Sequence, residues 1–402
     1  MVQEIDSQQK MGERIGSIDV LRLFFAVIIV LHHSRYVLGD ENCIFLGGSL
    51  AVEFFFYVSG YFLFLSVQKR EMQDEKEGKR EGIGTQTFHF ILHKIKSFLP
   101  EFLISWIIGF VLIAWLGHWT LRDIFRAFVE NFWELTLVRM SGLYTGGING
   151  VVWYLSAMLL AMAILYPLMR KNLDFMSHVG CPLISLFIYG YLMQTYGHPR
   201  DPSVWTGFAF KGLLRAIAGL CVGIVAAMAA GKIRKNLNGP GNKKELGPKT
   251  GGKAQITLLG SCFVTAIEGI CLFLCVRYMA LQTPGKTDYF YMFLLMILVI
   301  LCCCGLGIEN CLPSEKPGFQ KFLRFCSNYS LTLYLSHFYF AAHMNDVLDP
   351  SRFSGMERMG IYCILAFFNA FVVMGLSTLC RRKGKGVFLW FNRKLIRENE
   401  TR

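Results

Sequence analysis

Ten long apolar stretches make up most of this 402-residue chain, and they restrict its possible folds more than any other feature. A helix needs about 20 apolar residues to cross the roughly 30 Å hydrocarbon core of a bilayer. The stretches reach that length, some of them by tilting or with the help of flanking residues. They cover residues 17–38, 47–67, 97–117, 150–169, 179–196, 208–230, 255–279, 289–308, 325–345 and 359–380. The sequence therefore predicts an all-α integral membrane protein, a bundle of about ten transmembrane helices.

The composition agrees with a membrane protein. Hydrophobic residues make up 53% of the chain and charged residues only 17%, whereas soluble domains carry about a quarter charged residues. The net charge of +13 would suit a nucleic-acid-binding protein. The basic residues cluster in alternate loops, however, as topology determinants do. We therefore expect the lipid bilayer and no nucleic acid as a partner, with both chain ends in the cytosol, and a first span that is not cleaved.

The loops predict one membrane domain without a separate soluble domain. The segment 68–95 is highly charged, and the segment 231–254 is rich in Gly, Lys and Asn. The segment 118–149 mixes aromatic and charged residues, as in an amphipathic helix at the outer interface. The predicted organisation is a cytosolic tail (1–16), a membrane domain (17–380) with cytosolic loops at 68–95 and 231–254 and an outer segment at 118–149, and a basic cytosolic tail (381–402).

The thirteen cysteines lie mostly within the apolar stretches and include no CxxC pair. Cys302, Cys303 and Cys304 are consecutive, so they point in different directions on a helix. Buried cysteines of this kind usually serve as small packing residues. We expect no metal ion and no bound cofactor.

Arg22 and His33 are the first ionisable pair within a predicted span. Eleven residues at 100° each make three turns plus about 20°, so both side chains lie on one helix face, about 16 Å apart along the axis. Ionisable groups inside a membrane usually face a bundle interior or a wet cavity, where they serve function. A histidine hydrogen-bonded between helices is the alternative for His33.

Glu53 enters the second span from the outer side, at a depth similar to that of His33. A carboxylate near an imidazole can fix its tautomer and stabilise the imidazolium. Glu53 could equally form a structural ion pair with Arg35. Ser59 and Gly60 follow in the same span, where small residues favour close helix packing.

Three other ionisable residues have simpler interpretations. His32 lies 100° from His33 on the helix and is expected to pack against another element. Arg35, near the outer end, could extend to the interface. Glu268 lies in the middle of the seventh span, where structural and functional roles both stay open.

Five motifs occur in order along the chain, and together they resemble the membrane-bound acyltransferase 3 family, which includes bacterial surface-polysaccharide O-acetyltransferases. They are Arg22-x10-His33, Glu53-Phe-Phe-Phe-Tyr-Val-Ser59-Gly60, Val152-Trp153-Tyr154-Leu155-Ser156, Arg215-Ala-Ile-Ala-Gly219 and Ser327-Asn-Tyr329-Ser-Leu-Thr-Leu-Tyr334-Leu-Ser-His337. The resemblance extends over about residues 15–385.

The chain departs from the family pattern at the start of the third span. The family usually carries paired arginines before a proline there, but this chain has Lys94, Lys96 and Ser97 before Pro100. Lysine supplies a point charge without the fork geometry of arginine. Lys94 and Lys96 remain candidates for binding donor phosphate.

The resemblance implies acyl transfer, most simply of acetyl from acetyl-CoA as co-substrate, to a hydroxyl of a cell-surface or lipid-linked glycan, at a bacterial plasma membrane. A histidine is well matched to act as base on such a hydroxyl. The implied roles are base or acyl carrier for His33, assistance to it from Arg22 and Glu53, donor binding by Lys94, Lys96 and Arg215, and acceptor binding or structural support by Ser59, Gly60, Trp153, Tyr329 and His337. The glycan, the choice of acetyl or succinyl, and the oligomeric state stay open.

Three alternatives accompany this interpretation. Trp153 could be an ordinary aromatic residue at the membrane interface, and His337 a hydrogen-bonded histidine between helices. A flippase or transporter of lipid-linked saccharide without acyl transfer would also have many spans. Such a transporter often shows internal repeats, and the sequence has no evident repeat.

Overall fold

The computed structural model describes residues 14–78, 81–143, 147–238, 257–313 and 316–400, with side chains as far as residue 382. Within these residues the chain forms helices and turns, and no β-strand is present. The longer helices of the first half are α2 (Gly16–His32), α4 (Ala51–Glu77), α5 (Ile83–Leu116), α6 (Leu121–Glu130), α8 (Val152–Lys171) and α10 (Cys181–Tyr196). Those of the second half are α11 (Lys211–Asn238), α12 (Leu258–Leu281), α13 (Asp288–Cys304), α15 (Pro317–Ser336), α16 (Phe338–Val347) and α17 (Gly355–Glu400). Short helices are α3 (Arg35–Leu38), α7 (Phe132–Leu135), α9 (Leu173–Phe175) and α14 (Ile308–Cys311).

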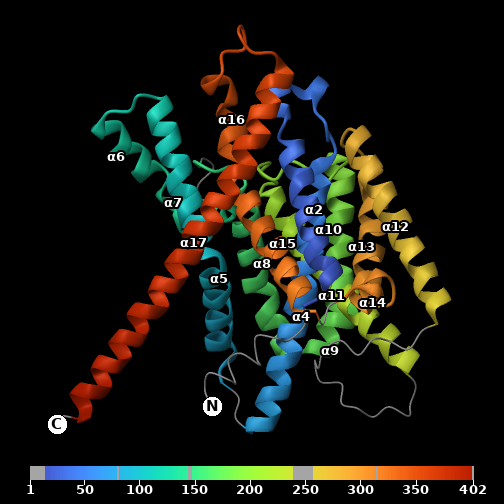
Figure 1. Cartoon of the computed structure of the whole chain (residues 1–402). Helices are drawn as coiled ribbons and strands as arrows, with labels where there is room; N and C mark the ends of the chain where they lie inside the picture. Colours follow the sequence, from blue (N-terminus) through green and yellow to red (C-terminus); the bar gives the residue numbers. More distant parts are fainter. Residues whose placement is uncertain (1–13, 79–80, 144–146, 239–256, 314–315, 401–402) are drawn as a thin grey trace.

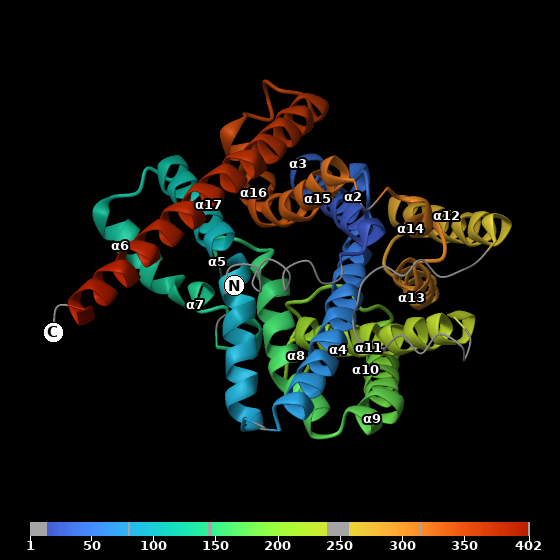
Figure 2. The same ribbon diagram turned by 60° about the horizontal axis from the view of Figure 1, so that its bottom comes forward.

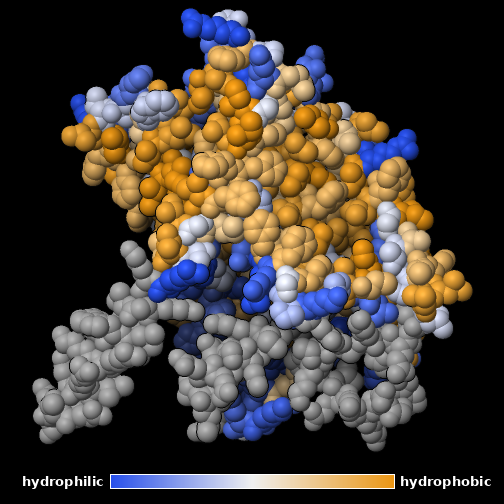
Figure 3. All heavy atoms as spheres, in the orientation of Figure 1, coloured by the Kyte–Doolittle hydropathy of each residue, from blue (hydrophilic) through white to orange (hydrophobic). Residues whose placement is uncertain are grey.

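The helical bundle confirms the predicted fold class. Nine helical segments in the described part of the chain are long and apolar enough to cross a membrane, and each overlaps a predicted span. Figure 3 shows hydrophobic residues in a broad band between hydrophilic residues at the top and bottom of the view. The chain is therefore a multi-pass membrane protein. The remaining predicted span, 325–345, is not among the nine, and the chain there is divided between α15 and α16.

Helices α4 and α11 pack closely at the centre of the bundle, with α12 and α13 to one side and α5, α6 and α7 to the other (Figures 1 and 2). Their backbones touch at two glycines. A Cβ atom on Gly60 would lie 2.1 Å from the Leu220 carbonyl oxygen, and one on Gly223 would lie 2.1 Å from that of Tyr57. Glycine lets membrane helices approach to this distance. The structure thus gives Gly60 the packing role that its sequence context favoured.

Much of the segment expected as the first cytosolic loop, 68–95, is helical, because α4 continues to Glu77 and α5 begins at Ile83. A buried polar cluster holds the two helices together. Arg170 of α8 pairs with Asp74 and donates from Nε to the Gln86 side chain at 2.9 Å. A buried guanidinium needs such partners, so this cluster orders the charged hairpin. Of the second expected loop, 231–254, the part beyond Asn238 lies outside the described residues.

The outer segment 118–149 begins with α6, which is strongly amphipathic as predicted. Thr120 and Asp123 form a capping box at its start: the Asp123 amide donates to Thr120 Oγ1 at 3.3 Å, and the Thr120 amide donates to Asp123 at 3.0 Å. Leu121 and Phe125 are exposed, 86% and 71% respectively. The exposed apolar face fits a helix lying on a membrane surface.

Candidate active site

Two histidines from opposite ends of the chain meet in the bundle. Nε2 of His337 lies 3.1 Å from Nδ1 of His33, and the ring centroids are 4.9 Å apart. His33 directly follows the last residue of α2, and His337 occupies the single position between α15 and α16. The bundle thus joins the Arg22-x10-His33 motif to the last motif of the chain.

The hydrogen-bond partners assign the protons on both rings. Nδ1 of His33 lies 2.8 Å from the Ile29 carbonyl oxygen, and Nδ1 of His337 lies 3.0 Å from that of Leu333. A carbonyl only accepts, so each neutral ring carries its hydrogen on Nδ1. His33 then shares its Nδ1–H between Ile29 and Nε2 of His337. Its own Nε2 keeps a lone pair that no described residue engages, and the side chain is half-buried, so this atom can accept a proton.

The break between α15 and α16 at His337 frees carbonyl groups inside the bundle, where water is scarce. Side chains from three other elements satisfy them. The Leu335 carbonyl accepts from Ser105 Oγ at 2.6 Å and from Asn149 Nδ2 at 2.5 Å. The next carbonyl along the chain accepts from Asn369 Nδ2 at 3.3 Å. These bonds hold His337 in place, because they fix the chain on its N-terminal side.

A buried carboxylate, Glu134 of α7, organises the loop before α8, beside this break. It accepts hydrogen bonds from Trp106 Nε1 at 2.9 Å, the Ile148 amide at 2.7 Å and the Asn149 amide at 3.1 Å. Arg139 lies 3.9 Å away. Burial raises the pKa of Glu134, and the hydrogen bond from Trp106 opposes that rise. Sequence reasoning missed this role; the available signal was one acidic residue within the otherwise apolar run 132–135.

Aromatic rings pack against the His33 imidazole. Tyr36 of α3 stacks on the imidazole with a centroid distance of 6.0 Å, and Phe338 meets it edge-on at 5.2 Å. Gly150, in the loop held by Glu134, packs against Phe338, since a Cβ there would lie 2.5 Å from that ring. Tyr36 is 47% exposed, so it forms an accessible edge of the site.

Arg22 lies in the N-terminal half of α2, about three helical turns from His33, as its position predicts. Its Nη1 atom pairs with Asp19 at 3.2 Å, and its guanidinium lies 5.3 Å from the centre of the Phe62 ring. Lys94 of α5 lies within electrostatic range of Arg22. Its ammonium lies over the Phe90 ring, 5.4 Å from the ring centre. Arg22 of α2 and Lys94 of α5 thus place two positive charges near the N-terminal half of α2, and this arrangement favours an anionic ligand.

Lys96 is exposed, and Ser97 donates from Oγ to a backbone carbonyl of its own helix. An arginine reaches this turn from another helix. Arg381 of α17 donates to the Ser97 carbonyl at 2.6 Å and pairs with Glu101 at 2.5 Å. A guanidinium thus stands beside the position where the family pattern places its second arginine, but a carboxylate already engages it.

Glu53 pairs with Arg215 in the bundle core, and both side chains are buried. Tyr189 donates to Glu53 at 2.9 Å, while Arg215 donates to the Ser49 carbonyl at 2.7 Å. The Arg215 guanidinium also lies 5.6 Å from the centre of the Trp153 ring. Neither Glu53 nor Arg215 is hydrogen-bonded to the histidine pair among the described residues. Their contacts form a closed structural network.

The remaining ionisable candidates also have partners. His32 is buried and its Nδ1 lies 2.7 Å from a backbone carbonyl of the loop before α4. Arg35 pairs with Asp40 at 2.8 Å, not with Glu53. Glu268 accepts from the first amide of α14 at 2.9 Å. These contacts are structural.

Ser59 and Tyr329 make local contacts within the bundle. Ser59 Oγ lies 3.2 Å from the Tyr154 hydroxyl. Tyr329 donates to the Phe367 carbonyl at 2.8 Å and so ties α15 to α17. Neither is hydrogen-bonded to the histidine pair within the ranges that the structure covers.

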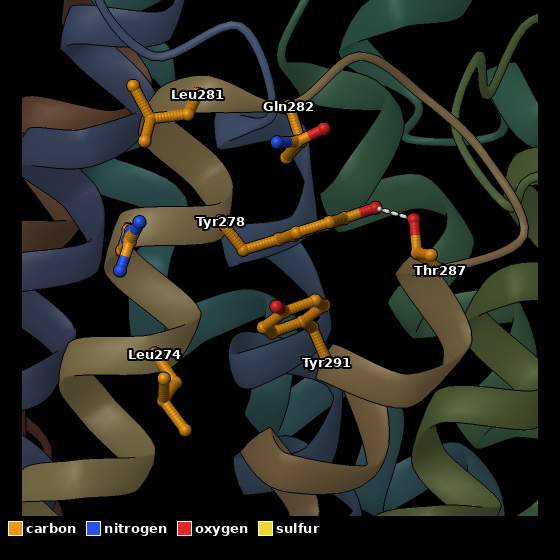
Figure 4. Close-up of a pocket in the computed structure, with 7 residues that line it drawn as sticks. Leu274, Tyr278, Leu281, Gln282, Thr287 and Tyr291 are labelled. Atoms are coloured by element: carbon orange, nitrogen blue, oxygen red, sulfur yellow. Dashed lines mark hydrogen bonds between the residues drawn. The ribbon is translucent and has the colours of Figure 1, made fainter.

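A cavity of about 370 Å³ lies apart from the histidine pair, between α12 and α13 (Figure 4). Tyr278 and Tyr291 stack there at a centroid distance of 3.8 Å, and the Tyr278 hydroxyl lies 2.6 Å from Thr287 Oγ1. This cavity includes no residue that the motifs single out. In the part of the chain with described side chains, no group of His, Cys, Asp or Glu residues could hold a metal ion.

Comparison with known proteins gives one match. A family model described as an acyltransferase domain matches residues 15–380, nearly the whole chain. No curated protein and no solved structure matches.

Proposed function

The chain belongs to the acyltransferase 3 family and is thus an acyltransferase that transfers groups other than amino-acyl groups; from this membership and the histidine pair we propose that it acylates a glycan hydroxyl. The donor is acetyl-CoA or another acyl-CoA, and the acceptor is a cell-surface or lipid-linked glycan. The enzyme works in a bacterial plasma membrane, with both chain ends in the cytosol, the side on which acyl-CoA is made.

The free lone pair on Nε2 of His33 is the observation that carries this proposal. A sugar hydroxyl is a poor nucleophile near neutral pH and needs a base within hydrogen-bond reach. His33 Nε2 supplies that base. When it takes a proton, the ring becomes an imidazolium whose Nδ1–H donates to His337 Nε2, 3.1 Å away. His337 therefore orients and stabilises the charged base, as the third group of a catalytic triad does.

In the proposed transfer the glycan hydroxyl reacts directly with the thioester. The hydroxyl oxygen attacks the thioester carbonyl carbon while His33 Nε2 takes the hydroxyl proton. The tetrahedral intermediate collapses, the carbon–sulfur bond breaks, and the imidazolium returns its proton to the thiolate of CoA. In the alternative sequence His33 Nε2 attacks the thioester carbon, the carbon–sulfur bond breaks, and the CoA thiolate leaves. The hydroxyl oxygen then attacks the acyl-histidine, the carbon–nitrogen bond to Nε2 breaks, and the hydroxyl proton passes to the CoA thiolate or to water. Both sequences need the same unprotonated Nε2 atom.

The donor side of the site lies about 16 Å from His33 along α2, by the helical rise. Arg22 and Lys94 gather there, and their charges suit the phosphates of CoA. The pantetheine arm spans the distance to His33. Lys96 lies on the same turns of α5 and supports phosphate binding, whereas Arg215 is engaged by Glu53 and acts through the fold.

On the acceptor side, the exposed ring of Tyr36 beside His33 offers an apolar surface against which a sugar ring can stack. Trp153 lies deeper, over Arg215. Tyr36 is therefore the better candidate for contact with the glycan, and Trp153 supports the core.

Transfer of labelled acetyl from acetyl-CoA to surface glycan from a strain that lacks this protein tests the proposal. Purified wild-type protein should label the glycan, and His33→Ala should lower the rate about 10²–10⁴-fold. His343→Gln is the matched control, because His343 is on α16 and pairs with Asp346 at 2.9 Å. Full activity of His33→Ala would remove His33 from the chemistry. Mass spectrometry of the protein after incubation with donor alone distinguishes an acylated histidine from a pure base.

A further inference from the structure

A groove of about 560 Å³ runs between α15 and α17, away from the histidine pair. Three cations line one part of it: Lys321 and Arg324 from α15, and Arg382 from α17. Apolar side chains line the rest, among them Phe371 and Leu379. We call this feature the basic groove. Figure 1 shows α17 diverging from the bundle towards its own C-terminal end; the residues of α17 that line the basic groove, 371–382, lie before that end.

The apolar wall of the basic groove is unusually open. Phe371 is 49% exposed and Leu379 is 53% exposed, although both line a hollow and not a flat face. Gly375 lies between them on α17, and a Cβ atom built on it would have no neighbour within 4 Å. The groove therefore has unfilled width along its apolar part, enough for a hydrocarbon chain lying against α17.

The cationic part lacks internal counterions. No described carboxylate pairs with Lys321, Arg324 or Arg382, whereas the adjacent Arg381 pairs with Glu101 at 2.5 Å. Three such charges at the end of an apolar groove attract an anion that carries an apolar tail. A lipid in the bilayer has this orientation, because its tail lies in the hydrocarbon region beside the apolar wall and its headgroup lies at the cations.

We propose that the basic groove binds an anionic phospholipid, with the phosphate at Lys321, Arg324 and Arg382 and an acyl chain along Phe371 and Leu379. Basic pockets between membrane helices on the cytoplasmic side recognise such headgroups, and the proposed topology places these cations on that side. The phosphates of acyl-CoA are the other phosphate source. The polar pantetheine arm suits the exposed apolar wall less well than a fatty chain does. Arg22 and Lys94 lie among α2, α4 and α5, which do not line the basic groove.

Native mass spectrometry of the full chain tests the proposal with two probes, phosphatidylglycerol and phosphatidylcholine of identical acyl chains. Wild-type protein should retain phosphatidylglycerol in preference. The variant Lys321→Gln/Arg324→Gln/Arg382→Gln should lose most of that preference, about tenfold or more in relative occupancy, since it removes every cation that lines the groove. The matched control replaces three exposed cations at the same end of the bundle but outside the groove, Lys171, Lys232 and Lys235, with glutamine. The control should keep the preference.

A second variant tests the apolar wall without changing charge. Gly375→Phe should fold, because nothing lies within 4 Å of the added Cβ, and its ring should fill the groove and displace the acyl chain. Phosphatidylglycerol occupancy should then fall at least several-fold. An unchanged preference in the triple variant, an unchanged phosphatidylglycerol occupancy in Gly375→Phe, or an equal loss of preference in the control would overturn the proposal. Displacement of phosphatidylglycerol by acetyl-CoA would also overturn it, by assigning the groove to the donor.

Discussion

Nε2 of His337 lies 3.1 Å from Nδ1 of His33, and the backbone carbonyls beside both rings fix which nitrogen carries each proton. In the proposed mechanism this contact makes His33 the base and His337 its supporting partner. It also joins the start of the chain to its last third, so the chemistry depends on how α15 docks against α2.

Replacing His337 should slow transfer without weakening donor binding. His337→Leu removes one of the two acceptors of His33 Nδ1–H and leaves the Ile29 carbonyl. The lost bond to a charged group is worth about 1.5–3 kcal/mol, which corresponds to a roughly 10–150-fold lower kcat. His337→Gln places an amide oxygen near the former Nε2 position and should recover part of the loss. The measurement is kcat and KM for acyl-CoA. Equal damage by Leu and Gln would show that His337 only fills space.

Arg22→Ala should raise KM for acetyl-CoA about tenfold and leave kcat within a few-fold, because a lost charge-assisted phosphate contact is worth about 1.5–3 kcal/mol. The KM of Arg22→Lys for acetyl-CoA should lie between those of the wild type and Arg22→Ala. Acetyl-pantetheine lacks the nucleotide phosphates and serves as the control donor. Its kinetics should be the same for wild type and Arg22→Ala; a similar defect with both donors would place Arg22 at the thioester.

Glu53 and Arg215 should prove to be coupled in stability. Removing one partner of a buried ion pair costs about 3–5 kcal/mol, whereas replacing both by apolar groups can be neutral. Glu53→Leu and Arg215→Met should each lower the unfolding temperature in detergent more than the double variant does. The exposed pair formed by Arg35 and Asp40 provides the comparison, and Arg35→Gln should change little. If Glu53→Leu melts like wild type but is inactive, Glu53 has the catalytic role that its depth suggested.

Glu134 should make stability depend on pH. Burial raises its pKa above the ordinary 4.5, so the folded protein binds a proton more tightly than the unfolded chain. Stability is then full below about pH 4.5 and declines as pH rises through the pKa of the folded state. Thermal unfolding across pH 4–8 should show this decline in wild type and a smaller one in Glu134→Gln. Identical slopes for the two proteins would contradict it.

The sequence predicted the fold class because long apolar runs report directly on membrane spans. It also predicted that Gly60 serves packing, and it placed Arg22 and His33 about three helical turns apart near one helix. It could not predict that the tenth span breaks at His337. The break depends on side chains from α5, α17 and the loop before α8, among them Ser105 and Asn369, which satisfy the freed carbonyls.

Glu53 illustrates why similar depth in the membrane does not predict which side chains are in contact. Glu53 and His33 were expected at similar depth, and nothing in the sequence said which way each helix is rotated. In the bundle α4 turns Glu53 towards α11, where Arg215 binds it. Likewise, Arg381 comes to Ser97 from a helix almost 300 residues further along the chain, and local sequence carries no signal for such a partner.

The break between α15 and α16 at His337 and the ring of Tyr36 are held by different parts of the chain. Every hydrogen bond to the carbonyls freed by the break comes from α5, α17 or the loop before α8. The Tyr36 ring at the mouth of the site contributes only aromatic contacts. If the proposed function holds, substitution at Tyr36 will alter which sugars are accepted while the proton transfer at His33 stays intact. Acceptor choice and catalysis would then be separable by mutation within this one site.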